Sequence, residues 1–170
     1  MSDRYLFITM VQANETGDLK GDAHPPKGLA WFCVSRRTLQ GGHAPFAGGR
    51  GPFRDLLVLH EAPPSMHVSV RGLACDARGR LYVSDPGSAT IRIFDQETMQ
   101  QTGRFTALRS RQIAVAPDGS LWALQAPDPS ATVTDLLKPE REDAEWRAVR
   151  YGGNGRALAT IWLPKDPAPT

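Results

Sequence analysis

Short apolar stretches, and stretches that alternate apolar and polar residues, recur along the chain and predict β-strands. They fall at 5–11, 29–35, 56–60, 68–75, 80–84, 90–94, 103–106, 112–116, 121–124, 132–136 and 158–163. Gly, Pro and Asp residues that form turns separate them, so that a strand begins about every 12–15 residues, a spacing typical of all-β folds. We therefore expect an all-β protein.

The segment 139–150 has two interpretations. Its early proline and the acidic residues that follow are typical of the first turn of a helix. It could equally be a polar loop that leads into a strand near 146–151, and the pattern does not choose between the two. We expect a single domain over 1–163 and a proline-rich tail outside the core at 164–170.

An internal repeat is the strongest signal in the sequence. The segment at 71–85 reads RGLACDARGRLYVSD and aligns with RQIAVAPDGSLWALQ at 111–125. Each copy holds a strand, a turn whose glycine can take positive φ, and a second strand with a large aromatic residue. The residues predicted to be structural in these units are Gly72, Asp76, Gly79, Tyr82, Asp85, Asp118, Gly119 and Trp122.

Weaker copies extend the repeat in both directions. The segment ATVTDLL at 131–137 matches ATIRIFD at 89–95, and RALATIWLP at 156–164 has the pattern of another opening strand. Towards the N-terminus, RYLFIT at 4–9 takes the place of RLYVSD at 80–85. In an alternative register, KGLA at 27–30 opens a copy of its own, although fewer positions then match.

The repeat resembles the blades of NHL-repeat β-propellers. The residues that carry the resemblance are GLACD at 72–76, Gly79, LYVSD at 81–85 and IRIF at 91–94. The second copy is also similar to blades of streptogramin-lyase and gluconolactonase-like propellers. The Asn-His-Leu tripeptide that names the NHL family is replaced by Ser-Ala-Thr at 88–90. The resemblance implies four-stranded blades arranged around an axis, a fold that supports many functions.

The strands suffice for about three blades, whereas propellers typically have about four to eight. Three interpretations stay open. Two chains could close one ring of about six blades, or the chain could be a fragment or one piece of a larger complex. Alternatively, the second register could give a small four-bladed ring closed by the N-terminal strand.

The long predicted loop at 41–53, GGHAPFAGGRGPF, is a candidate binding element. It lacks the Gly-Lys-Ser/Thr ending and the βαβ context of a phosphate-binding loop. Its aromatic and basic residues could stack on a ligand or contact a partner. The candidate residues in and beside it are His43, Phe46, Arg50, Phe53 and Arg54.

The charge distribution favours no particular class of partner. The net charge of +2 is too small to indicate nucleic acid binding. The most basic stretch, 20–54, could be a solvated loop or could bind an anionic polymer.

The histidines and cysteines predict neither a metal site nor a cofactor. The four histidines have no metal-ligand spacing, and the two cysteines, Cys33 and Cys75, are expected to be buried thiols. The resemblance to lactonase and lyase propellers implies a divalent metal under an enzymatic alternative. No residue of this sequence can be matched to their ligands.

We therefore expect a non-enzymatic interaction scaffold that binds a protein partner, or a second copy of itself, through loops at one rim. The alternatives are a metal-dependent lactonase- or lyase-like enzyme and a binder of an anionic polymer. No membrane span or export signal is evident in the sequence, so a cytoplasmic location is expected.

Overall fold

The computed structural model describes residues 5–9, 29–35, 56–59, 72–85, 88–125 and 146–163, and gives only the backbone at 8–9, 29–35 and 56–59. These residues form strands and no helix, which confirms the all-β prediction. The strands are β1 (Tyr5–Thr9), β2 (Leu29–Ser35), β3 (Leu56–Leu59), β4 (Leu73–Cys75), β5 (Arg80–Asp85), β6 (Thr90–Asp95), β7 (Gln101–Thr106), β8 (Ser110–Val115), β9 (Leu121–Gln125), β10 (Arg147–Tyr151) and β11 (Ala157–Trp162).

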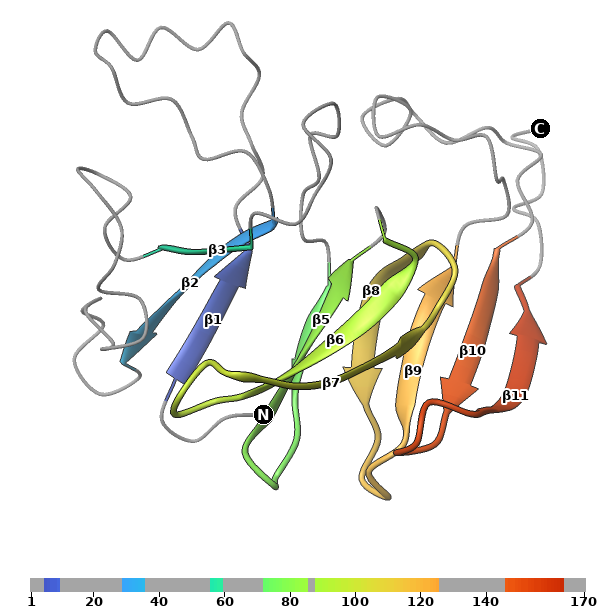
Figure 1. Ribbon diagram of the computed structural model, residues 1–170. Coiled ribbons are helices and arrows are strands. Elements are labelled where there is room, and N and C mark those ends of the chain that lie inside the picture. The colour runs from blue at the N-terminus through green and yellow to red at the C-terminus, as the bar shows by residue number, and fades with distance from the viewer. Residues whose placement is uncertain are drawn as a thin grey trace, which may run out of the picture.

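The strands form three antiparallel sheets that stand side by side like successive propeller blades (Figure 1). The first sheet has the order β1-β2-β3, the second β4-β5-β6-β7, and the third β8-β9-β10-β11. In each sheet every strand pairs with the next one along the chain, as short turns between antiparallel strands favour. The described residues do not close into a ring, since the first and third sheets lie on opposite sides of the second (Figure 1).

The structure decides two alternatives that the sequence left open and overturns one prediction. Of the two interpretations of 139–150, the strand near 146–151 is confirmed where the segment is described, because β10 is a strand that pairs with β9. The segment 156–164 does not open a new blade, since β11 is the last strand of the third sheet. The register that opens a blade at 27–30 fails because β2 is the middle strand of the first sheet.

The segment 156–164 does not open a new blade because of the turn between β10 and β11. The backbone N–H of Gly155 donates to the carbonyl of Gly152 at 2.9 Å, which closes a tight turn and returns the chain along β10. A two-strand hairpin of this kind is local, so it forms irrespective of the resemblance of 156–164 to an opening strand. The expected third strand at 132–136 lies outside the described residues, and β10 occupies the third position in the sheet.

The core lies between the second and third sheets. Tyr82 and Ile91 of the second sheet pack on Leu121, Ala123 and Val149 of the third. All five side chains are buried, and burial of each large apolar side chain contributes about 1.5–3 kcal/mol. This contact is therefore a major source of stability among the described residues, beside the fully buried Leu81, Val83 and Phe94 on the other face of the second sheet.

The two sheets approach most closely where a glycine stands. A Cβ atom on Gly72 would lie 2.5 Å from the backbone carbonyl oxygen of Arg111, in the neighbouring sheet. Beside it, the Ser84 hydroxyl donates to the carbonyl oxygen of Ser110. Only glycine permits this approach, which gives the predicted structural role of Gly72 a physical basis.

The first sheet contacts the second through β1. The Tyr5 hydroxyl donates to Glu97 Oε2 at 3.2 Å, and the Tyr5 and Phe7 rings lie 5.9 Å apart. Strand alternation places Leu6 on the opposite face of β1, where it is 49% exposed. The repeat alignment had put Leu6 in the position of Tyr82, but it is Tyr5 that reaches the second sheet.

Candidate interaction surface

A rim of short turns joins the strands at the lower end of the molecule in Figure 1. In the first turn, Asp76 Oδ1 accepts hydrogen bonds from the backbone N–H groups of Arg78 and Arg80, both at 2.9 Å. Its Oδ2 accepts from Arg80 Nε at 2.6 Å and from the Tyr82 hydroxyl at 3.3 Å. Asp76 is thus a turn residue, and Gly79 in the same turn takes a φ of 79°.

Burial acts to raise the pKa of the Asp76 carboxyl, but it is outweighed by groups that stabilise the charged form. These are the hydrogen bonds from the backbone and guanidinium of Arg80, the charge of that guanidinium and the N–H of Arg78, and together they hold the pKa below its usual range. Asp76 is therefore ionised at neutral pH, and its charge is neutralised by the ion pair with Arg80.

The equivalent turn in the third sheet also holds an aspartate, but two positions further along, since Ala116 aligns with Asp76 and Asp118 with Arg78. Asp118 Oδ1 accepts from the hydroxyl of Ser120 at 2.6 Å and from its backbone N–H at 3.0 Å, and these bonds lower the pKa of Asp118. The other carboxylate oxygen pairs with Arg150 Nη2. Gly119 takes a φ of 80°, matching Gly79 one unit earlier.

Two adjoining hollows of about 320 and 520 Å³ open on this rim. Arg78, Arg80 and Asp118 line both of them, with Asp76 in the smaller and Arg150 in the larger. Both carboxylates are already paired with arginines. The Ser120 hydroxyl, which lines the larger hollow, donates to Asp118 Oδ1 at 2.6 Å, so this hydroxyl and carboxylate are both engaged in the turn.

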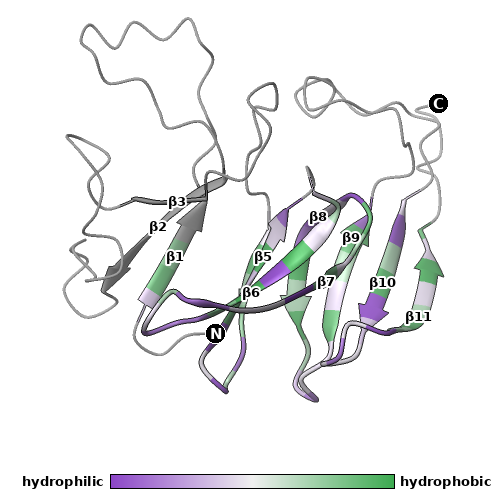
Figure 2. Cartoon of the chain, viewed as in Figure 1, coloured by the Kyte–Doolittle hydropathy of each residue, from purple (hydrophilic) through white to green (hydrophobic). Residues whose placement is uncertain are grey.

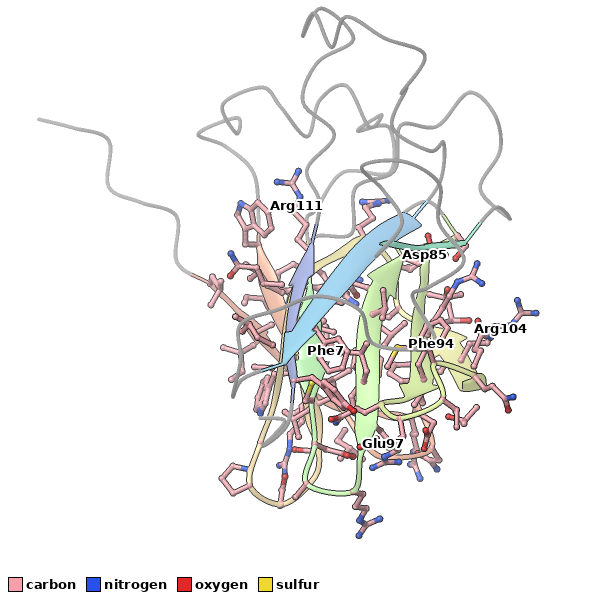
Figure 3. All side chains as sticks on the ribbon, turned by 90° about the vertical axis from the view of Figure 1, so that its left-hand side faces the viewer. Phe7, Asp85, Phe94, Glu97, Arg104 and Arg111 are labelled. Carbon is pink, nitrogen blue, oxygen red and sulfur yellow. The ribbon has the colours of Figure 1, made fainter. Side chains whose placement is uncertain are left out.

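The other predicted turn aspartate, Asp85, is part of a buried ion pair. Its Oδ2 accepts from Arg92 Nε at 2.8 Å and from the Ser88 hydroxyl at 2.5 Å, while Arg92 also donates to Gln101 Oε1 at 3.3 Å. Both charged side chains are about 95% shielded from solvent. Figure 3 shows Asp85 at the end of the second sheet opposite Glu97, away from the turn rim. Its role is structural.

One face of the second sheet packs on the third sheet, whereas the matching face of the third sheet meets no described sheet. We call the face of the β4–β7 sheet that bears Tyr82 its forward face, and the face that bears Leu81 its rear face. The forward face of this sheet packs on the rear face of the β8–β11 sheet, which bears Leu121. The forward face of the β8–β11 sheet bears Trp122, and no described sheet covers it.

The pairing registers identify the residues on that open face. Ala114, Trp122, Arg150 and Ala159 lie opposite one another across the four strands, as Leu124, Ala148 and Ile161 do one row further along. Cross-strand partners point to the same side of a sheet. These two rows are therefore apolar apart from Arg150, which pairs with Asp118.

Exposure is greatest along β11, the edge strand of the third sheet, all six residues of which are exposed. Ile161 is 51% and Trp162 59% accessible to solvent, and Leu158 and Leu163 are also exposed. Figure 2 shows hydrophobic colour along most of β11. Trp162, which the repeat had placed in an opening strand, is mostly exposed in the edge strand, with Arg147 over its ring at 5.8 Å.

The loop residues predicted to bind a partner all lie outside the described residues. They are His43, Phe46, Arg50, Phe53 and Arg54. The structure therefore neither gathers nor separates them. The open face and edge of the third sheet were missed at the sequence level, because Ile161 and Trp162 were assigned to an opening strand that would be buried.

The described residues hold neither a cluster of metal ligands nor a helix that could span a membrane. In the part of the chain with described side chains, no group of three His, Cys, Asp or Glu residues could hold a metal ion. Cys75 is a half-buried thiol. No helix among the described residues is long and apolar enough to cross a membrane.

Comparison with known proteins gives the chain no family. No protein-family model and no curated protein matches its sequence. Among solved structures, it is similar to hydrazine synthase of Kuenenia stuttgartiensis, with 12% identity and a TM-score of 0.47. That match covers 80% of this chain and 30% of the hydrazine synthase chain.

Proposed function

We propose that this chain is a non-enzymatic interaction scaffold, built of propeller-like blades, that binds a protein through the forward face of the β8–β11 sheet. One observation carries the proposal. The position that Tyr82 fills in the core between sheets is filled in the next sheet by Trp122, on a face that no described sheet covers. The likeness of 71–124 to NHL blades supports the propeller part of the proposal. A cytoplasmic location stays a prediction.

The composition of the open face suits a protein interface. Interface centres are enriched in aromatic and large apolar residues and poor in charge, and contiguous apolar patches on a soluble surface mark binding sites. Trp122, Leu124 and Ile161 provide such a centre. The one charged residue in these rows, Arg150, is already neutralised by Asp118, so covering the face would not leave it without a counter-charge.

The edge of the same sheet adds a second mode of contact. An exposed edge strand offers backbone N–H and C=O groups to a partner strand, and natural proteins usually protect such edges. The sequence of β11, ALATIW, carries no charged residue and no proline that would do so. The open face and the open edge are therefore parts of one binding surface.

The test is a single charge placed on the open face. Ile161→Asp should weaken association of the chain, with itself or with a protein that copurifies with it, by at least about 10-fold in Kd. Leu108→Asp is the matched control, because Leu108 is 49% exposed and lies in the turn after β7. A chain that associates with nothing, or whose association withstands Ile161→Asp, would contradict the proposal.

A further inference from the structure

We infer that the protein covering the forward face of the β8–β11 sheet is the β1–β3 sheet of a second copy, so that two chains close one ring head to tail. This inference rests on the proposed function and names its partner. It is argued from the contact between the second and third sheets, which serves as a template.

The contact between the second and third sheets joins two different faces, a forward face and a rear face. The forward face of the second sheet, with Tyr82 and Ile91, packs on the rear face of the third, with Leu121 and Val149. The third sheet repeats the same strand order and orientation, so its forward face has the geometry to receive another rear face (Figure 1). A surface of this kind differs from its complement, so the contact it makes is heterologous.

The complement must therefore be a rear face that is not yet covered. The rear face of the third sheet is covered by the second. On the rear face of the second sheet, Leu81, Val83 and Phe94 are fully buried. In the first sheet, Tyr5 of β1 contacts Glu97 of the second sheet's β6–β7 turn, whereas Leu6, on the opposite side of β1, is 49% exposed. The Leu6 side is therefore the candidate rear face at the other end of the row.

The described sheets of one chain leave these two ends apart. The first and third sheets stand at opposite ends of a row of three (Figure 1). Two copies placed head to tail give about six sheets, within the range of blade numbers that close into propellers. Each copy then covers the forward face of the other, and both junctions are the same. A heterologous contact that closes in this way ends in a dimer and not in a filament.

The test uses the full chain and three single substitutions matched in exposure. Size exclusion with light scattering should give the unmodified chain a mass twice its 18.6 kDa. Ile161→Asp and Leu6→Asp should each raise the dimer Kd by at least about 10-fold, while Leu108→Asp should leave it unchanged. Ile161, Leu6 and Leu108 are all about half exposed in one chain, so a charge at each position should leave the fold intact. An unchanged melting temperature of each monomeric variant excludes unfolding as the cause of a weaker dimer.

Mixing the two dissociated variants separates a head-to-tail ring from other dimers. A mixed pair has one junction with both substitutions and one junction with neither, so labelled Ile161→Asp and Leu6→Asp chains should associate more tightly with each other than either does with itself. Loss of the dimer in Ile161→Asp but not in Leu6→Asp would overturn the head-to-tail arrangement and leave the proposed function standing. It would indicate that two β8–β11 sheets meet each other.

The remaining outcomes are also decisive. A chain that stays monomeric but binds another protein through a face sensitive to Ile161→Asp would overturn the second copy as the partner and keep the proposed function. A dimer indifferent to both Ile161→Asp and Leu6→Asp would overturn both proposals.

Discussion

Tyr82 and Trp122 occupy the same position in successive sheets, one pairing with Ala74 and Ile93, the other with Ala114 and Arg150. Tyr82 is buried between the second and third sheets, whereas Trp122 lies on the open forward face. The same residue class at the same position thus serves the core in one sheet and a surface in the next.

The first prediction follows from this asymmetry. Tyr82→Ala should lower the free energy of unfolding by about 3 kcal/mol, since it removes a large buried ring and leaves a cavity. Trp122→Ala should cost less than half of that in the monomeric chain, because its ring is only partly buried. Urea unfolding of both variants in the Leu6→Asp background makes the comparison, and equal losses would argue that the forward face is already covered within one chain.

Replacing Asp85 should be among the most damaging single changes. Asp85→Ala leaves Arg92 buried without its counter-charge, and breaking a buried pair in this way costs about 3–5 kcal/mol. Asp118→Ala removes an equally well-formed but solvent-exposed pair with Arg150 and should cost far less. The two are compared by chemical denaturation, and similar losses would mean that burial does not set the strength of these pairs.

Acid should destabilise the protein partly through Asp76. The pKa of this carboxyl is lowered in the folded chain, so folding favours its ionised form. The stabilisation is fully present above the unfolded pKa of about 4, and it is lost as the pH falls through the lowered folded value. Asp76→Asn should flatten the fall in melting temperature between about pH 5 and pH 2. An unchanged acid profile would show that other carboxylates dominate it.

The turn glycine Gly119 should resist substitution although open space surrounds it. Its φ of 80° is costly for an L-residue, so Gly119→Ala should lower stability by about 1–2 kcal/mol. Gly103 is the matched control. It lies in β7, where an added methyl group would make only an ordinary contact, 3.6 Å from Ile93 Cδ1, and its loss should stay within about 0.5 kcal/mol.

The parts of the fold that the sequence predicted well are those fixed by local turns. The hairpins at 72–85 and 110–125 each join two strands through an Asp or Pro-Asp turn ending in Gly, so both strands and their register follow from neighbouring residues. The strand β10 was ambiguous because the proline and acidic residues before it are typical of the first turn of a helix. In the structure Arg147 bonds to Gln125 and Arg150 pairs with Asp118, which gives both charges a place in the sheet.

The proposed interaction surface could not have been found from the sequence. An apolar strand such as β11 reads the same whether it lies at the centre of a blade or at its exposed edge, since the pattern gives its faces but not its neighbours. The buried pair of Asp85 and Arg92 was missed for a similar reason, because an arginine in a strand indicates a solvated face until its partner on the next strand is known.

The most direct measurement is the native mass of the unmodified chain in solution, by light scattering across the micromolar range. Two copies that cover each other's open faces should give twice the mass of one 18.6 kDa chain, with dissociation only on dilution. A single-chain mass at every concentration would contradict the closed two-chain ring.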